Sequence, residues 1–179
     1  MIEQIVEYNK KFVENKGYEP YLTSKYPNKK LAVLTCMDTR LTELLPAALG
    51  IKNGDAKIIK NAGGVIVHPY GSVVRSLLVA ILELGVEQVM VIGHTDCGVQ
   101  GMDGNELLGE LVERGIDKEH IDIVRHSGID LEKWLGGFES VEKSVEETVH
   151  ALKTHPLMPK DIEIKGFIMD SETGELTEV

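Results

Sequence analysis

The sequence predicts an α/β fold: a mainly parallel β-sheet of about four to five strands, flanked by helices. Short apolar segments rich in β-branched residues are typical of strands buried in a sheet, and helical segments with one apolar face lie between them. Strands that alternate with helices favour a parallel sheet covered on both faces. The expected strands are residues 30–36, 55–64 with a glycine loop at the end, 87–94 and 161–170, and a fifth at 176–179.

The first half of the chain begins with an amphipathic helix at residues 2–14. The apolar side chains that share one face of it are Ile2, Ile5, Val6, Phe12 and Val13. The segment "KLAVLTC" is short and apolar, as expected of a buried strand. "LTELLPAALG" predicts a helix that ends at Gly50, and Pro46 must lie near its first turn or bend it.

The second half continues the alternation. Ser72 begins a helix with apolar residues at helical spacing, which Gly85 closes. After the strand "EQVMVIGH", residues 104–125 predict one or two short polar helices, and residues 140–154 predict an amphipathic helix. The last strand is followed by the turn "SETGE", which can fold "LTEV" back beside it.

Composition limits the classes of function. The 179 residues are enough for one domain, which we expect to span residues 1–179, and 42% of them are hydrophobic. The net charge of −10, without a basic stripe, would repel a phosphate backbone, so we expect no nucleic-acid partner. No apolar run is long enough for a membrane span, and the first residues lack a secretory pattern, so we expect no membrane partner and a cytoplasmic location. In a reducing compartment, two cysteines are more often metal-binding or catalytic than paired.

Both cysteines fall at predicted strand ends. Cys36 lies at the end of the first strand, and His94 and Cys97 follow the third. In open α/β sheets, ligands bind at the carboxyl ends of strands, so the fold can bring these residues into one crevice. Two thiolates and an imidazole form a ligand set that favours zinc and leaves a fourth position open. The alternatives are small buried cysteines without chemistry and a Cys36–Cys97 redox disulfide, which leaves His94 without a role.

Three motifs carry a family resemblance. "CMDTR", "KNAGG" and "GHTDCG" together resemble the β-class carbonic anhydrases, and the compact length is similar to the short prokaryotic branch of that family. The resemblance implies a zinc-dependent lyase that reversibly hydrates carbon dioxide to bicarbonate and a proton. It also implies a homodimer or a higher even-numbered homo-oligomer, with the helix at residues 2–14 packed on a partner subunit.

The resemblance assigns roles by position. Cys36, His94 and Cys97 would hold one zinc ion per chain, and Asp38 and Arg40 would be the catalytic pair. The resemblance also places Asn61, Ala62 and Gly63 in the lining of the substrate pocket. The chain differs from many members at Thr39, where serine is frequent, and at Gly64, where asparagine is common.

Several alternatives stay open at this point. Similar proteins hydrolyse carbon disulfide or carbonyl sulfide with the same zinc ligands, and a non-catalytic zinc-binding module is a third possibility. Asp38 can be tied to Arg40 or can bind the metal as a fourth ligand, and the sequence does not choose between these arrangements. A histidine such as His68 could relay protons.

Overall fold

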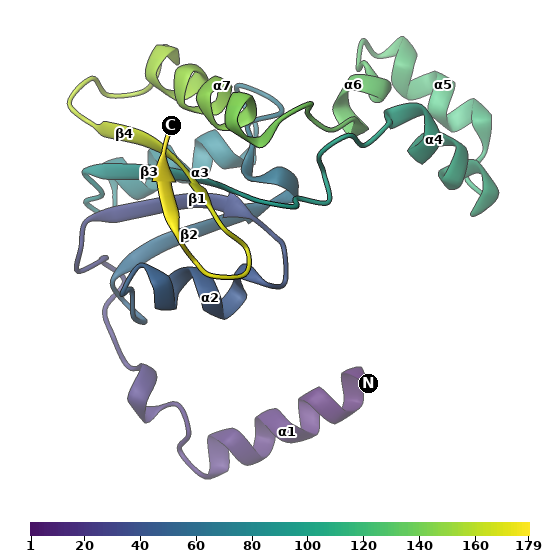
Figure 1. Ribbon diagram of the computed structural model, residues 1–179. Coiled ribbons are helices and arrows are strands. Elements are labelled where there is room, and N and C mark those ends of the chain that lie inside the picture. The colour runs from purple at the N-terminus through teal and green to yellow at the C-terminus, as the bar shows by residue number, and fades with distance from the viewer.

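The computed structural model describes residues 1–179 and has an α/β architecture built on one five-stranded sheet (Figure 1). The strand order is β2-β1-β3-β4-β5; the first four strands are parallel and β5 is antiparallel to β4. The strands are β1 (Leu31–Cys36), β2 (Ala56–Asn61), β3 (Gln88–His94), β4 (Glu163–Met169) and β5 (Leu176–Glu178). The predicted fold class is therefore confirmed, with the five strands at the upper end of the expected number.

Seven α-helices and two short 3-10 turns connect and flank the strands. The helices are α1 (Ile2–Glu14), α2 (Leu41–Ala48), α3 (Ser72–Leu82), α4 (Gly104–Glu113), α5 (Lys118–His126), α6 (Leu131–Leu135) and α7 (Val141–Thr154). The 3-10 turns are η1 (Glu19–Tyr21) and η2 (Ala62–Gly64). The polar segment predicted as one or two helices forms two, α4 and α5. Pro46 is the sixth residue of α2 and not in its first turn.

Helices cover both faces of the sheet, and the alternation along the strands explains which residues each face buries. Val89 and Val91 of β3 belong to the cluster that contains the buried side chains of α3 and α7. Ile92 of the same strand belongs to the cluster built with α2 on the opposite face. Successive side chains of a strand point to opposite faces, so a central strand buried on both sides is apolar throughout.

The parallel register brings the important strand ends together. Cys36 is the last residue of β1 and lies opposite Asn61, the last residue of β2. His94 is the last residue of β3, the neighbour of β1 on the other side. Just before it, Gly93 lets α7 approach closely, because a Cβ there would lie 2.7 Å from methyl groups of Val141 and Val145. The carboxyl edge of the sheet therefore carries the residues that the sequence analysis singled out.

Two parts of the chain project from this core (Figure 1). Helices α4, α5 and α6 have a small apolar cluster of their own, formed by Leu108, Ile121 and Leu131. Helix α1 stands away from the sheet and contributes no buried residue. None of the helices is both long and apolar enough to cross a membrane.

Candidate metal centre

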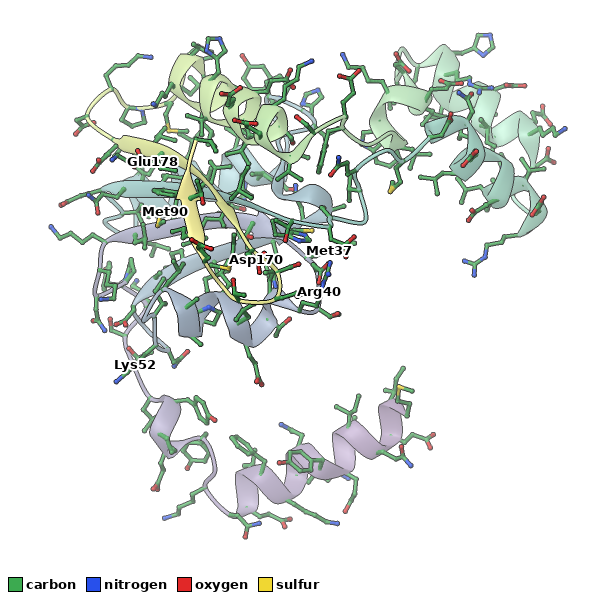
Figure 2. The ribbon with its side chains drawn as sticks, in the orientation of Figure 1. Met37, Arg40, Lys52, Met90, Asp170 and Glu178 are labelled. Carbon is green, nitrogen blue, oxygen red and sulfur yellow. The ribbon has the colours of Figure 1, made fainter.

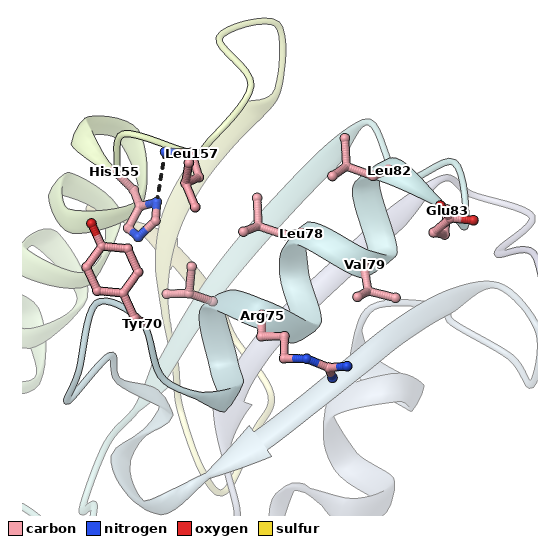
Figure 3. Close-up of a pocket in the computed structure, with 9 residues that line it drawn as sticks. Tyr70, Arg75, Leu78, Val79, Leu82, Glu83, His155 and Leu157 are labelled. Carbon is pink, nitrogen blue, oxygen red and sulfur yellow. Dashed lines mark hydrogen bonds between the residues drawn. The ribbon is translucent and has the colours of Figure 1, made fainter.

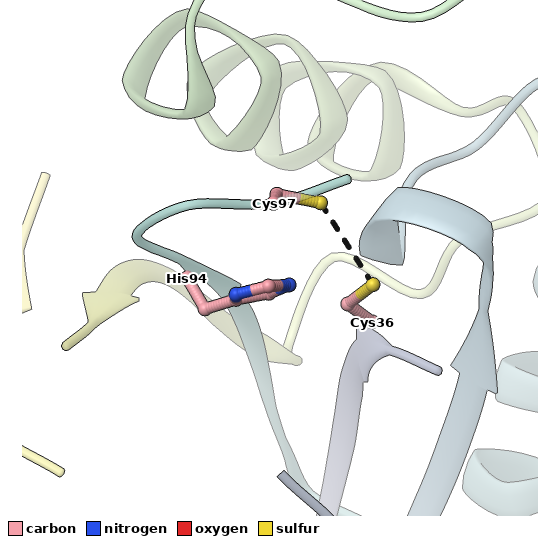
Figure 4. Close-up of side chains that lie close together, drawn as sticks. All are labelled: Cys36, His94 and Cys97. Carbon is pink, nitrogen blue, oxygen red and sulfur yellow. Dashed lines mark hydrogen bonds between the residues drawn. The ribbon is translucent and has the colours of Figure 1, made fainter. Parts of the chain in front are cut away.

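Three side chains with metal-binding atoms converge at the carboxyl edge of the sheet. One ligand atom each from Cys36, His94 and Cys97 lies within 4.8 Å of the others, and all three residues are buried (Figure 4). β1 supplies the first cysteine, β3 supplies the histidine, and the turn after β3 supplies the second cysteine. Residues 61 positions apart in the chain thus meet because β1 and β3 are neighbours in the sheet.

Hydrogen bonding fixes the histidine in one orientation. The Nδ1 atom of His94 lies 2.8 Å from the carbonyl oxygen of Thr95, so Nδ1 must carry the proton and donate it. The Nε2 atom then presents a lone pair, yet it is buried and has no hydrogen-bond partner. A buried nitrogen left without a partner is costly unless something else binds it. A metal ion is the group that fits a bare imidazole nitrogen facing two sulfurs.

The backbone of Thr95 is itself held in place. Its amide donates to the carbonyl oxygen of Met169 at 3.0 Å, and its hydroxyl accepts a hydrogen bond from the amide of Ser171 at 3.0 Å. The turn after β3 is therefore fixed to the segment after β4. This network holds the carbonyl that orients His94, as partners around a metal-binding imidazole usually do.

The two thiols are close but not bonded. The Sγ atoms of Cys36 and Cys97 are 3.9 Å apart, and both cysteines are free. Thiolates at about 2.3 Å from one tetrahedral ion would be about 3.8 Å apart, so the spacing fits a shared metal. Burial raises the pKa of Cys97, and the neighbouring Cys36 raises it further. A bound cation favours the thiolate form, so it would offset the effect of burial on Cys97.

Beside this cluster, Asp38 and Arg40 form the expected ion pair (Arg40 is labelled in Figure 2). The guanidinium donates through Nε to Oδ1 at 3.1 Å and through Nη2 to Oδ2 at 2.8 Å, and the backbone amide of Arg40 also donates to Oδ1 at 2.8 Å. These contacts, chiefly the side-chain hydrogen bonds from Arg40, lower the pKa of Asp38 to about 2. The carboxylate lies at the cluster, with Oδ2 3.8 Å from Nε2 of His94.

The glycine loop after β2 lies against Cys36, and the side chain of Asn61 fixes its shape. The amide of Asn61 closes the loop, because Nδ2 donates to the carbonyl of Val65 at 2.7 Å and Oδ1 accepts from its backbone amide at 3.1 Å. Gly64 has a φ of +67°, and a Cβ there would lie 2.9 Å from the backbone nitrogen of Cys36. Ala62 is exposed, whereas Gly63 is buried.

Sequence reasoning missed several residues around the cluster. Asp96 accepts a hydrogen bond from Arg40, and Val99 and Phe138 are the nearest side chains to the position of a Cβ on Gly63. Asp96 lies inside the "GHTDCG" motif, so its proximity to the histidine was a signal that could have been used. Phe138 follows α6 and reaches the cluster only through the tertiary fold, for which the local sequence holds no signal.

A surface groove of about 470 Å³ lies elsewhere, over the outer side of α3 (Figure 3). Its lining is mainly apolar and includes Tyr70, Leu78 and Leu157. At one end, His155 donates through Nε2 to the carbonyl of Pro69 at 2.8 Å and accepts at Nδ1 from the amide of Leu157 at 3.2 Å. None of the residues of the sulfur and imidazole cluster lines this groove, so it is separate from the candidate metal centre.

Comparisons with known proteins agree with this geometry. The family model described as "Carbonic anhydrase" matches residues 31–176. "Putative carbonic anhydrase YvdA" of Bacillus subtilis is 51% identical over 175 residues, which cover 98% of this chain and 89% of that protein. A "Carbon disulfide hydrolase" of Acidithiobacillus thiooxidans is 32% identical over 161 residues, covering 83% of this chain and 72% of that protein.

A solved structure shows the same fold over nearly the whole chain. The β-carbonic anhydrase isoform I of the protozoan Trichomonas vaginalis superposes with a TM-score of 0.88 at 35% sequence identity, covering 99% of this chain and 96% of that one. The family model extends from the first residue of β1 to the first residue of β5. The chain belongs to the β-carbonic anhydrase family.

Proposed function

We propose that this protein is a zinc-dependent lyase that catalyses the reversible hydration of carbon dioxide to bicarbonate and a proton. The observation that carries the proposal is the arrangement at the sheet edge. Three buried donor atoms lie within 4.8 Å of one another, and an ionised carboxylate held by an arginine lies beside them. Membership of the carbonic anhydrase family supports this reaction.

Cys36, His94 and Cys97 would hold one zinc ion per chain. Two thiolates and one imidazole suit zinc better than magnesium or calcium, which prefer oxygen ligands. Three protein ligands leave the fourth tetrahedral position for water or substrate. When bound, the ion supplies a Lewis acid that turns water into a nucleophile able to attack the carbon of carbon dioxide.

Asp38 would position that water, and Arg40 would position Asp38. The bidentate contact with Arg40 keeps the carboxylate ionised and supports the arrangement in which Asp38 is tied to Arg40 and is not a fourth metal ligand. An ionised carboxylate only accepts hydrogen bonds. Asp38 can therefore orient the attacking oxygen by accepting a hydrogen bond from its O–H group. The bidentate fork of arginine fixes a carboxylate in a way that a lysine cannot.

The substrate is small and apolar, and the surroundings of the cluster match it. Val99 and Phe138 lie next to Gly63 of the glycine loop, and both pack against the apolar cluster that includes the two cysteines. We therefore retain the loop at residues 61–63 as part of the pocket wall, with Asn61 holding its shape. Apolar walls favour carbon dioxide over water at the reaction centre.

Activity should rise toward alkaline pH. Two thiolates neutralise the double positive charge of the zinc ion, so such a site acidifies water less than a zinc ion held by three neutral imidazoles, for which the pKa of the bound water is about 7. We expect kcat/KM for hydration to increase between about pH 6 and pH 9. A flat profile over this range would contradict the neutral-charge ligand set.

Carbon disulfide is the second candidate substrate, because a relative that is 32% identical over 83% of this chain is named a carbon disulfide hydrolase. Carbonyl sulfide belongs to the same alternative. Assays of carbon dioxide, carbonyl sulfide and carbon disulfide on one preparation separate these activities. Turnover of carbon dioxide well above that of the two sulfur compounds supports the proposal, and the reverse order overturns it. Zinc without any of the three activities would favour a non-catalytic zinc-binding module.

We further propose a homodimer or a higher even-numbered homo-oligomer in which α1 packs on a partner subunit. Helix α1 has an apolar face but buries none of its residues in its own chain.

We also propose a cytoplasmic location, which the two free cysteines support, because cysteines stay reduced in that compartment.

A further inference from the structure

The guanidinium of Arg40 is held from two sides. One side faces Asp38 through Nε and Nη2, as described above. The other side faces Asp96, where Nη1 donates to the carboxylate Oδ2 at 2.8 Å and Nη2 donates to the backbone carbonyl at 2.8 Å. Nη2 is therefore shared between the two aspartates, and all three nitrogens of the guanidinium have a partner.

Asp96 lies on the turn that carries the metal-binding side chains. It stands between His94 and Cys97, and its backbone is in the left-handed region with a φ of +53°. This conformation points the carbonyl and the carboxylate of one residue toward the same arginine. A residue other than glycine adopts it at a cost, and aspartate and asparagine tolerate it better than most.

We propose that Asp96 is a positioning residue for the reaction: it anchors Arg40 to the metal-binding turn and so keeps the Asp38 carboxylate at a fixed distance from the metal. The inference rests on the proposed function. Without the anchor, the guanidinium can rotate about its long side chain and release one oxygen of Asp38. The released carboxylate lies close enough to compete for the open metal position, since Oδ2 is already 3.8 Å from Nε2 of His94.

The size of the effect should be modest. The Asp96 side chain is 86% exposed and that of Arg40 is 39% exposed, and solvent weakens ion pairs between exposed groups. The backbone carbonyl of Asp96 also survives any substitution. We therefore expect kcat/KM to fall about three- to fivefold on loss of the carboxylate, far less than on loss of Arg40 itself.

Asp96→Gly is the decisive variant, because it removes the carboxylate and at the same time relieves the left-handed backbone. We expect it to bind one metal ion per chain, to unfold at the same temperature as the wild type or a higher one, and still to lose activity. Asp96→Asn, which keeps an acceptor oxygen, should lose less. Asp161→Asn is the matched control, since it removes an exposed carboxylate whose side chain makes no hydrogen bond or ion pair in this structure.

Two further measurements distinguish positioning from a general effect. In the cobalt-substituted protein, Asp96→Gly should shift the visible absorption bands toward those of Arg40→Lys, because both variants loosen Asp38 beside the metal. In an Arg40→Lys background, Asp96→Gly should have no additional effect on kcat/KM or on the cobalt spectrum. Unchanged bands in Asp96→Gly, or effects of the two substitutions that simply add, would overturn the proposal. Failure of the wild type to hydrate carbon dioxide would overturn the proposed function instead, and the cobalt spectra would still test the anchor.

Discussion

At the scale of single residues, the proposed metal ligands and the pair Asp38 and Arg40 have different roles, which substitution separates. Cys97→Ala removes one of three ligands, so the metal content should fall from about one ion per chain to nearly none. Arg40→Ala leaves the three proposed ligands in place, so it should retain the metal. It should lose at least about 100-fold in kcat/KM, because Asp38 would no longer be held in position. Metal analysis and a hydration assay on both variants check this, and full activity in Arg40→Ala would remove Asp38 and Arg40 from the mechanism.

The lowered pKa of Asp38 makes a separate prediction about stability. Arg40 lowers this pKa to about 2, below the ordinary value of 3.8. The ion pair therefore stabilises the fold fully above pH 4, and the stabilisation is lost as the pH falls toward 2. In urea unfolding of the metal-free protein, the stability gap between the wild type and Asp38→Asn should be constant from pH 6 to pH 5 and should narrow toward pH 3. A gap that does not change with pH would show that Arg40 does not favour the ionised form.

The sequence predicted the residues of the candidate metal centre, but not every contact around them. The pair Asp38 and Arg40 was expected from the resemblance carried by "CMDTR", and the ion pair forms. The convergence of Cys36 with His94 was expected because parallel strand ends share one edge. Asn61 was expected to line the pocket, which stays a prediction, and its amide also closes its own loop, which was not expected. The sequence shows an amide beside glycines, yet it does not show which acceptor that amide will reach.

At the scale of elements, the glycine loop is predicted to be a support for Cys36. Gly64 is in the left-handed region, and a Cβ there would press on the backbone of β1 at 2.9 Å. Gly50 has a similar φ of +61° with nothing within 4 Å of a Cβ, so Gly50→Ala is a matched control for the cost of the conformation alone. We expect Gly50→Ala to cost about 1 kcal/mol of unfolding free energy, and Gly64→Ala to cost about 1–3 kcal/mol more.

The same pair of variants also tests the link to metal binding. Gly64→Ala should weaken metal affinity, because displacement of the Cys36 backbone moves its sulfur, while Gly50→Ala should leave the affinity unchanged. Calorimetric titration with zinc measures both. Equal stability and equal affinity in the two variants would show that the loop does not support Cys36.

The sequence predicted most strands and helices well, because each follows from a local pattern of apolar residues. The apolar stretch of β3 and the helical spacing of the apolar residues in α7 both predict burial against a neighbouring element. For Pro46, the first of the two expected alternatives is excluded, since it lies in the sixth position of α2 and not near its start. The helix is short, and the missing amide hydrogen of Pro46 removes only one bond near its end.

At the scale of the whole molecule, α1 is the part whose role depends on assembly. Ile2 is 79% exposed, Ile5 62% and Val6 51%, so the apolar face of this helix is largely open to solvent in one chain. Burying such a face on a partner subunit is favourable at about 25 cal/mol per Å². The sequence predicted the helix and its apolar face, but the identity of the covering surface depends on a second chain that no local pattern describes.

The assembly can be tested by charge placed on each face of α1. Ile5→Lys should reduce the number of subunits in the assembly or strongly weaken their association, because a lysine on the apolar face would be buried at the contact. Gln4→Lys adds the same charge on the polar face and should leave the assembly unchanged. Sedimentation velocity at several concentrations distinguishes them. The same assembly for both variants and the wild type would exclude α1 from the interface.

The most direct test of the central claim is a count of zinc ions per chain together with a carbon dioxide hydration assay on the same sample. The account predicts one zinc ion per chain in the wild type and hydration activity that disappears with the metal on chelation and returns when zinc is restored. A protein that purifies without zinc and cannot take it up, or that holds one zinc ion per chain and leaves carbon dioxide unchanged, would contradict it.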